Sequence, residues 1–235
     1  MRLNKFLAHA GVSSRREADK LIKNAMVTVN GIVLDNPAYQ VQEQDEVIFN
    51  NQKLRPAAES VVIKFNKPPN VITTASDPQN RPTVFNYIKH DKRLFPVGRL
   101  DRDSTGLLLI TNDGELANLL MHPKHRIPRI YLVSIDKPFQ RWEITRLNKG
   151  IYMGQNEKGR AEVIEQVTVK KRTTVKLRLH QGKKHEVRRL MMRLKRKLFS
   201  LQRIEFGPIR LGDLPEGKWV KLSASELKDL AKIKR

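Results

Sequence analysis

The chain has 235 residues, 39% of them hydrophobic and none of them cysteine, and Lys and Arg outnumber Asp and Glu by 46 to 24. This composition supports one or two folded domains and excludes a disulfide scaffold, a cysteine nucleophile and cysteine-ligated metal sites. No apolar run approaches the roughly 18 residues of a membrane span, and the N-terminus lacks a signal-peptide hydrophobic region, so we expect a cytoplasmic protein with no membrane partner.

The first 60 residues predict a small module of their own. Apolar residues at helical spacing indicate a helix over 2–10 that ends at Gly11. Ser14 and Glu17 form the S-x-x-E pattern of a capping box for a second helix, whose apolar stripe is Ala18, Leu21, Ile22 and Ala25. A strand with an Asn-Gly turn at 30–31 and a returning strand at 47–50 follow, and 54–60 reads as a linker.

The remainder of the chain predicts strands with few helices between them. We expect strands near 61–66, 107–111, 129–135, 162–170, 173–180 and 199–206. Helices are expected at 83–90, after strand 107–111 with Leu116, Leu119 and Leu120 facing inward, at 185–195, and at 223–233. The buried stripe of helix 185–195 is Val187, Leu190, Met191 and Leu194. Because strict βαβ alternation is missing, the fold class is α+β with a mixed, mostly antiparallel sheet.

The positive charge is concentrated in this second part. Residues 1–60 carry 8 basic against 7 acidic side chains, whereas residues 61–235 carry 38 against 17. Segment 170–203 holds 14 basic residues and one acid, Glu186. Solvated faces usually mix both signs, so this segment favours contact with a nucleic acid over a plain solvated surface.

Familiar cofactor and metal motifs are missing from the sequence. It contains no phosphate-binding loop, no dinucleotide fingerprint and no nucleophile elbow. The six histidines include no H-x-x-x-H pair. We therefore expect neither a cofactor nor a metal ion.

One acidic residue, Asp101, lies between Arg99 and Arg102 just before the apolar strand 107–111. Asp103 and Asp113 have simpler explanations as turn and cap residues. A structural ion pair would account for Asp101, but so would a carboxylate that serves as a nucleophile or a base. A role as a metal ligand is less favoured, because a second close carboxylate is missing.

The run GRLDRDSTGLLLITNDG, followed by MHP and a K/R-x-Y element, resembles the RsuA-type (RsuA/RluB/RluE/RluF) family of ribosomal RNA pseudouridine synthases. LNKFLAHAGVSSRREADKLI and VTVNG resemble the S4-like RNA-binding domain of that family, and FGPIRLGDLPEGKWVKLSASEL resembles its C-terminal strand and helix. The resemblance implies an S4-like domain over 1–58 and a pseudouridine synthase catalytic domain over 61–235, with a mixed, mostly antiparallel sheet flanked by helices.

The same resemblance implies three catalytic residues. Asp101 corresponds to the essential carboxylate of GRLD, Tyr131 to the tyrosine that stacks on the target base, and Arg188 to the arginine that pairs with the Asp. Two positions depart from the family pattern, since Arg129 replaces the Lys of K-x-Y and Glu186 replaces the usual Gln of G-R-N-R-Q-V-R-R-M. At KPPN, Asn70 stands where the family often has Gly, and Asn tolerates a positive φ.

The basic residues of both parts are candidate RNA contacts. They are Arg2, Lys5, Arg15, Arg16, Lys20, Arg99, Arg102, Arg129, Lys183, Lys184 and Arg189. The expected partner is ribosomal RNA, either free or in an assembly intermediate, bound by a monomer.

The predicted function is isomerisation of a specific uridine in ribosomal RNA to pseudouridine. The ELANLLMHP segment resembles the large-subunit branch of the family more than the small-subunit branch. The alternatives are a small-subunit target and a non-catalytic RNA-binding ribosome-assembly factor. A pure RNA binder has no use for a carboxylate, which repels phosphate, so the triple Asp101, Tyr131 and Arg188 favours the enzyme.

Overall fold

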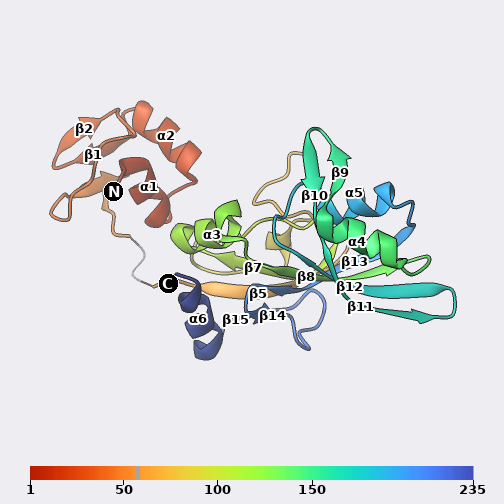
Figure 1. The fold of residues 1–235 in the computed structure, drawn as a ribbon. Coiled ribbons are helices and arrows are strands. Elements are labelled where there is room, and N and C mark those ends of the chain that lie inside the picture. Colours follow the sequence, from red (N-terminus) through yellow and green to blue (C-terminus); the bar gives the residue numbers. More distant parts are fainter. Residues whose placement is uncertain (57–58, 235) are drawn as a thin grey trace. The chain divides into compact units, whose positions relative to one another are not determined.

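The computed structural model describes residues 1–56 and 59–234, which divide into two compact units (Figure 1). The first unit holds Met1–Val61 together with His90–Leu94 and Asn112–Gly114, and the second holds the rest. Residue 58, the expected end of the first domain, and residue 57 of the expected linker 54–60 lie outside the described residues. Within the described residues, no helix has the length and apolar character that crossing a membrane requires.

The first unit contains the two helices that the sequence predicts and a four-stranded sheet. Ser14 caps the second helix, because its Oγ accepts a hydrogen bond of 3.1 Å from the backbone N–H of Glu17. Ala25 lies beyond the end of that helix and is exposed, unlike Ala18 and Ile22, which are buried. The helices are α1 (Leu3–His9) and α2 (Arg15–Lys23), and the sheet order β2-β1-β3-β4 comprises β1 (Val27–Val29), β2 (Ile32–Leu34), β3 (Val47–Phe49) and β4 (Gln52–Lys53).

The second unit is built on one long sheet in the order β11-β12-β8-β13-β7-β5-β15. Two short strands join it, β6 beside β7 and β14 beside β13. The strands are β5 (Val62–Lys67), β6 (Phe95–Pro96), β7 (Thr105–Thr111), β8 (Arg129–Ile135), β11 (Glu162–Val169), β12 (Arg172–Leu179), β13 (Leu198–Phe206), β14 (Ile209–Arg210) and β15 (Trp219–Lys221).

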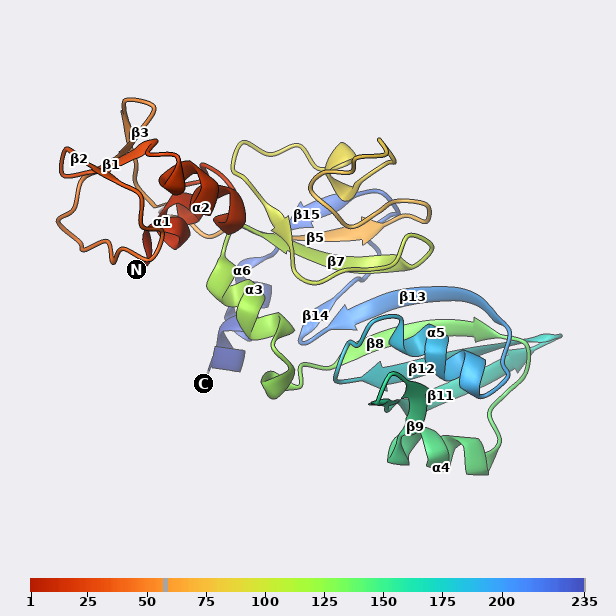
Figure 2. The same ribbon diagram turned by 90° about the horizontal axis from the view of Figure 1, so that it is seen from above.

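The sheet consists of two halves that meet at β7 and β13. Every neighbouring pair in it is antiparallel except this one, which is parallel and pairs only Gln202 with Thr105 and Arg203 with Gly106. Seen from above, β5, β7 and β15 form one half, and β8, β11, β12 and β13 form the other (Figure 2). The central position of β7 explains why Leu107–Ile110 is fully buried, since both faces of the strand are covered.

Helices cover the second half on one face. Helices α4 (Arg141–Lys149) and α5 (Glu186–Arg193) and the hairpin of β9 (Ile151–Gly154) and β10 (Glu157–Gly159) lie on the same side of the sheet (Figure 1). Their apolar residues pack with those of β8 and β12 in one core cluster. The cluster contains all four residues of the predicted stripe, Val187, Leu190, Met191 and Leu194.

A second cluster surrounds β7. It joins Leu107 and Leu109 to α3 (Gly114–Met121) and α6 (Ala224–Ala231). Leu116 and Leu120 of α3 are buried and Leu119 is partly buried, so all three face this core as the sequence predicts. The remaining short elements are the 3-10 turns η1 (Val84–Asn86), η2 (Pro123–His125) and η3 (Lys232–Lys234).

Two expectations about local structure were wrong or incomplete. The helix expected at 83–90 is only the 3-10 turn η1, because Asn86 Oδ1 accepts a hydrogen bond from the backbone N–H of Thr83 and closes a single turn. Helix α4 was not predicted, although Gln140 and Glu143 form a capping box at its start and Gly150 follows its end. The turn at Asn70 has a φ of 62°, as expected of an Asn in place of Gly.

The junction of β7 and β13 gives a direct test of the fold. A Cβ on Gly106, which has a φ of +95°, would lie 2.2 Å from the backbone O of Arg203. Gly106→Ala is therefore expected to lower the free energy of unfolding by about 2–5 kcal/mol, through strain and overpacking together. Urea-induced unfolding measures this loss.

Gly212→Ala is the matched control, because Gly212 also has a positive φ, of +60°, but no atom within 4 Å of its Cβ position. It should cost only the left-handed backbone penalty, about 1–2 kcal/mol. Equal losses in the two variants would show that the close approach at Gly106 does not constrain the fold.

Candidate active site

Asp101 lies in the loop between β6 and β7, and this loop is tied to the neighbouring segment. Thr73 Oγ1 donates to the backbone O of Leu100 at 2.9 Å and accepts from the backbone N–H of Leu100 at 3.3 Å. The backbone N–H of Ser104 donates to the backbone O of Asp101 at 3.0 Å, which closes a turn. The loop therefore has a defined conformation next to the buried strand β7.

Lys67, at the end of β5, anchors the same loop through hydrogen bonds. It is fully buried, and its Nζ donates to the backbone O of Pro68, Arg102 and Ser104 at 2.8, 3.0 and 2.8 Å. Burial lowers the pKa of Lys67 to about 8, against the opposing attraction of Asp103 and Asp101. The ammonium group uses its three hydrogens on three carbonyls, so it links the end of β5 to the turn that follows Asp101.

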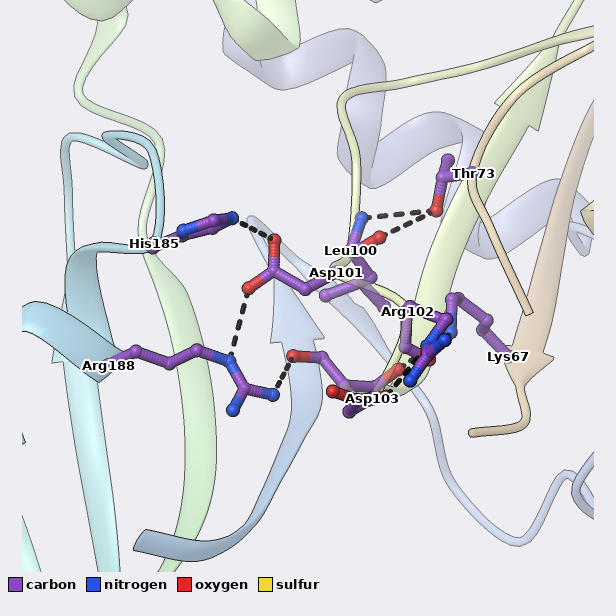
Figure 3. A network of polar contacts seen from close by, with 9 residues as sticks. Lys67, Thr73, Leu100, Asp101, Arg102, Asp103, His185 and Arg188 are labelled. Carbon is purple, nitrogen blue, oxygen red and sulfur yellow. Dashed lines mark hydrogen bonds and ion pairs between the residues drawn. The ribbon is translucent and has the colours of Figure 1, made fainter. Parts of the chain in front are cut away.

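The Asp101 carboxylate is held between two side chains of the other half of the sheet (Figure 3). Arg188 Nε lies 3.3 Å from Asp101 Oδ2, and His185 Nε2 lies 3.4 Å from Oδ1. Arg188 Nη2 also donates to Ser104 Oγ at 3.3 Å. Arg188 is on α5 and His185 is its N-cap, so residues 87 and 84 positions away in the sequence face the two carboxylate oxygens.

The pair of Asp101 and Arg188 serves to position the carboxylate more than to stabilise the fold. The side chains are 31% and 34% exposed. Ion pairs with this access to water contribute only about 0–1 kcal/mol to stability. The exposure also leaves the carboxylate accessible to a bound molecule.

Asp101 forms part of the wall of a cavity of about 220 Å³. Tyr131 of β8 and Arg188 line the same cavity, so the structure brings the three expected catalytic residues together. Pockets that enclose drug-sized ligands usually measure about 300–1,000 Å³. The smaller volume suits one planar ring or a comparable part of a larger ligand.

The cavity also has three buried charged residues in its wall, Arg129, Glu186 and Arg203. Glu186 Oε2 accepts a hydrogen bond of 3.0 Å from the backbone N–H of Lys183, while Oε1 has no hydrogen-bond partner among the described residues. Burial raises the pKa of the Glu186 carboxyl group, against backbone hydrogen bonds that lower it. Arg203 Nε donates to the backbone O of Leu107 at 2.7 Å, while Nη2 has no hydrogen-bond partner in the part of the chain that the structure describes.

The basic residues expected to contact RNA in this unit occupy different environments. Arg99, Arg129 and Lys183 line the cavity, and Lys184, which follows Lys183 in the sequence, is exposed. Arg102 is exposed and pairs with Asp103 at 3.1 Å, and Arg129 is buried with its guanidinium on the backbone O of Leu120 and Ile127. Arg189 pairs with Glu157 and donates to two carbonyls of the β9–β10 hairpin, those of Met153 and Gly154.

In the first unit, the expected RNA contacts lie on or next to α1 and α2. Arg2 precedes α1, and Lys5 lies within it. Arg15, Arg16 and Lys20 are exposed on α2, where Lys20 also pairs with Glu17 at 3.2 Å. Four of the five basic residues therefore lie on α1 and α2, and Arg2 is the N-cap of α1.

Sequence reasoning missed the roles of His185, Lys67 and Arg203. Alternation along β13 gave a signal for Arg203, since it follows Leu201 at a spacing of two and both are buried. No local signal marks His185, because its contact with Asp101 requires the loop before α5 to approach the β6–β7 loop. Among the described residues, no three His, Asp or Glu side chains form a group that could hold a metal ion.

Comparison with known proteins places this geometry in a family. Residues 61–193 match the model of the RNA pseudouridylate synthase family, and residues 1–47 match the S4 domain model. An uncharacterised RNA pseudouridine synthase of Aquifex aeolicus (strain VF5) is 38% identical, over 99% of this chain and 94% of the relative.

Other relatives match over the same length. The ribosomal large subunit pseudouridine synthase B of Bacillus subtilis (strain 168) is 35% identical, over 97% of this chain and 95% of the relative. The dual-specificity RNA pseudouridine synthase RluF of Escherichia coli (strain K12) is 33% identical, over 99% of this chain and 79% of the relative. A crystal structure of a pseudouridylate synthase superimposes with a TM-score of 0.70 at 28% identity, covering 98% of this chain and 99% of that one.

The raised pKa of Glu186 leads to a pH-dependent prediction. A carboxyl group whose pKa is higher in the folded state costs stability as the pH rises through that pKa and the buried group ionises. Glu186→Gln removes this cost and retains an oxygen that can accept from Lys183. The variant should therefore gain melting temperature relative to the wild type at pH 7–8, with a smaller gain at pH 4–4.5.

The measurement is thermal unfolding of both proteins across this pH range. Glu205→Gln is a control, because Glu205, on β13 of the same unit, is an acid that is not buried. A melting-temperature difference for Glu186→Gln that does not change with pH would rule out the cost of ionising Glu186 as its cause.

Proposed function

The chain belongs to the RNA pseudouridylate synthase family, and on this premise we propose that it isomerises a specific uridine of ribosomal RNA through the Asp101 carboxylate. The protein is an RNA pseudouridine synthase with an S4 domain at its N-terminus. One observation supports the choice of residues, namely that Asp101, Tyr131 and Arg188 line one cavity and Arg188 contacts the carboxylate.

The reaction exchanges one bond of uridine for another. The glycosidic bond between N1 and C1′ breaks, the base turns, and C5 bonds to C1′ while C5 loses its proton and N1 gains one. Atoms and electrons balance within the nucleotide, so no oxidant, reductant or second substrate is consumed. The step requires a carboxylate either as a nucleophile, at C1′ of the sugar or C6 of the base, or as a base at C2′.

We assign this carboxylate role to Asp101, because its environment both orients it and leaves it accessible. Its oxygens are oriented by Arg188 at 3.3 Å and His185 at 3.4 Å, and its partial exposure permits contact with a nucleotide. We assign Tyr131 to stacking on the target base, since it lines the same cavity. Arg188 is a positioning residue, because it acts through Asp101 and Ser104.

The energetics require contacts beyond the base. Flipping a uridine out of its stack costs roughly a few kcal/mol, and stacking on an aromatic ring returns about 1–3 kcal/mol. These two contributions nearly cancel, so the affinity must come from the RNA backbone. The surplus of basic residues in 61–235, 38 against 17 acids, is suited to that task.

Ribosomal RNA of the large subunit is the proposed substrate. The Bacillus subtilis relative is named for the large ribosomal subunit and matches nearly the full length of this chain. The S4 unit is proposed to add RNA contacts through residues at the N-cap of α1 and along α1 and α2, namely Arg2, Lys5, Arg15, Arg16 and Lys20. We propose that the protein acts as a monomer on free ribosomal RNA or an assembly intermediate.

Asp101→Asn tests the catalytic assignment. The amide keeps the size of the side chain but cannot act as a nucleophile or base, so isomerisation should fall by at least about 10²-fold. Affinity for RNA should stay within a few-fold of the wild type. Mapping of pseudouridines in ribosomal RNA from cells that lack the protein, with and without each form restored, identifies the uridine and measures the loss.

Asn112→Asp serves as a control for expression and handling, since it changes an amide at a position away from the cavity lining. Pseudouridine formation by the purified Asp101→Asn protein would refute the role given to Asp101. A set of pseudouridines unchanged by loss of the protein would refute the proposed substrate.

Deletion of residues 1–58 tests the role of the first unit. The remaining chain retains every residue of the cavity wall and should stay folded. We expect weaker binding to ribosomal RNA or lower selectivity for the target uridine, because five basic candidate contacts are removed. Circular dichroism and binding to transcribed ribosomal RNA provide the two readouts, and an unfolded truncation would contradict the division of the chain.

A further inference from the structure

A second basic cavity lies next to the candidate active site within the same unit. It measures about 200 Å³, and we call it the flanking pocket. Its wall includes Arg126, Arg160, Glu162, Arg178, His180 and Gln181. Gln181 also lines the cavity of Asp101, so the two cavities share a wall residue.

The charge of the flanking pocket is unbalanced. Arg178 uses the single acid of the wall, because its Nη1 lies 3.1 and 2.9 Å from the two carboxylate oxygens of Glu162. Within residues 1–56 and 59–234, neither Arg126 nor Arg160 has an ion pair among the salt bridges of the structure. Both are exposed, so two guanidinium groups remain available to an anion.

Arg126 is fixed in an unusual conformation. Its φ of 48° is left-handed, which costs a residue with a side chain about 1–2 kcal/mol. His180 Nδ1 lies 2.9 Å from the backbone O of Arg126, and since a carbonyl only accepts, Nδ1 carries the hydrogen. The left-handed conformation makes Arg126 the C-cap of η2, and the bond with His180 ties it to the end of β12.

Arg160 is positioned by a glycine. A Cβ on Gly150 would lie 3.1 Å from Cγ of Arg160, so the stem of Arg160 passes close over the backbone of Gly150. The glycine therefore leaves room for the arginine at this place. Two arginines, from the loop before β8 and the loop before β11, reach the same pocket from separate directions.

We infer that the flanking pocket binds a phosphodiester group of the RNA strand, next to the uridine whose base enters the Asp101 cavity. Arginine presents its N–H groups in a planar fork that fits two phosphate oxygens. A strand that places one base in the Asp101 cavity must lead its charged backbone away from that cavity, and the flanking pocket, which shares Gln181 with it, offers two arginines that form no ion pair within the described residues. This inference rests on the proposed function, and it assigns Arg126 and Arg160 to substrate binding.

The test compares two double variants, each of which loses two positive charges. The double variant Arg126→Gln and Arg160→Gln is compared with the double variant Lys221→Gln and Lys228→Gln, which removes the same charge from exposed positions on β15 and α6. The probe is a short RNA hairpin that contains the uridine identified by mapping. Binding is measured by titration across salt concentrations, and single-turnover rates are measured at saturating RNA.

The arginine variant should bind about ten-fold more weakly or worse, with the rate at saturation unchanged. Its plot of log affinity against log salt should be shallower by about 0.7 for each lost phosphate contact. The lysine variant should change affinity by less than two-fold. An equal loss of RNA affinity in the two variants would overturn the inference, because it would attribute the loss to net charge.

Neutral phosphates in the RNA locate the contact. Hairpins that carry a single methylphosphonate at each position around the uridine should show one position where the wild type loses affinity and the arginine variant does not. Such coupling indicates direct contact, and a variant that remains as sensitive as the wild type at every position would overturn the inference. Since this readout needs no turnover, it can fail while pseudouridine formation succeeds, or the reverse.

Discussion

The close approach of Gly106 to the backbone of Arg203 is the contact on which the site depends. Two parallel residue pairs join β7 to β13, and this pairing joins the two halves of the sheet. Only a glycine permits this distance, because a Cβ would lie 2.2 Å from a backbone oxygen. Asp101 approaches from the half that contains β7, whereas Tyr131 and Arg188 belong to the half that contains β13. A small change at this junction would separate the carboxylate from its partners.

The conformation of the Asp101 loop is also fixed by buried residues. Lys67 donates one hydrogen bond to the neighbouring Pro68 carbonyl and one each to the carbonyls of Arg102 and Ser104 in the loop, and burial lowers its pKa to about 8. Thr73 holds the backbone of Leu100 from the other side. An exposed ion pair contributes little energy, so the contact with Arg188 can orient Asp101 only because the backbone beneath it is already fixed.

Local pattern in the sequence predicted the elements that are long and apolar. It failed for residues whose environment is set by tertiary contacts. Strand β7, strand β8 and the stripe of α5 followed from spacing alone. Arg99 and Arg102 are the neighbours of Asp101 in sequence, yet Arg102 turns to Asp103 and only the family motif pointed to Arg188. His185 and Lys67 had no signal, because a histidine or lysine in a loop or at a strand end is usually exposed, and only the folded chain brings the carboxylate and the carbonyls to them.

The basic surplus of the chain serves two different purposes, and burial separates them. Lys67, Arg129 and Arg203 are buried, and each donates to backbone carbonyls, so these cations belong to the fold. Arg126 and Arg160 are exposed in a pocket with one acid that is already paired. A buried cation with carbonyl partners cannot release counterions when RNA binds, whereas an exposed and unpaired one can. The salt dependence of RNA binding should therefore reflect the number of exposed, unpaired basic residues. A phosphate count based on net charge alone would be too high.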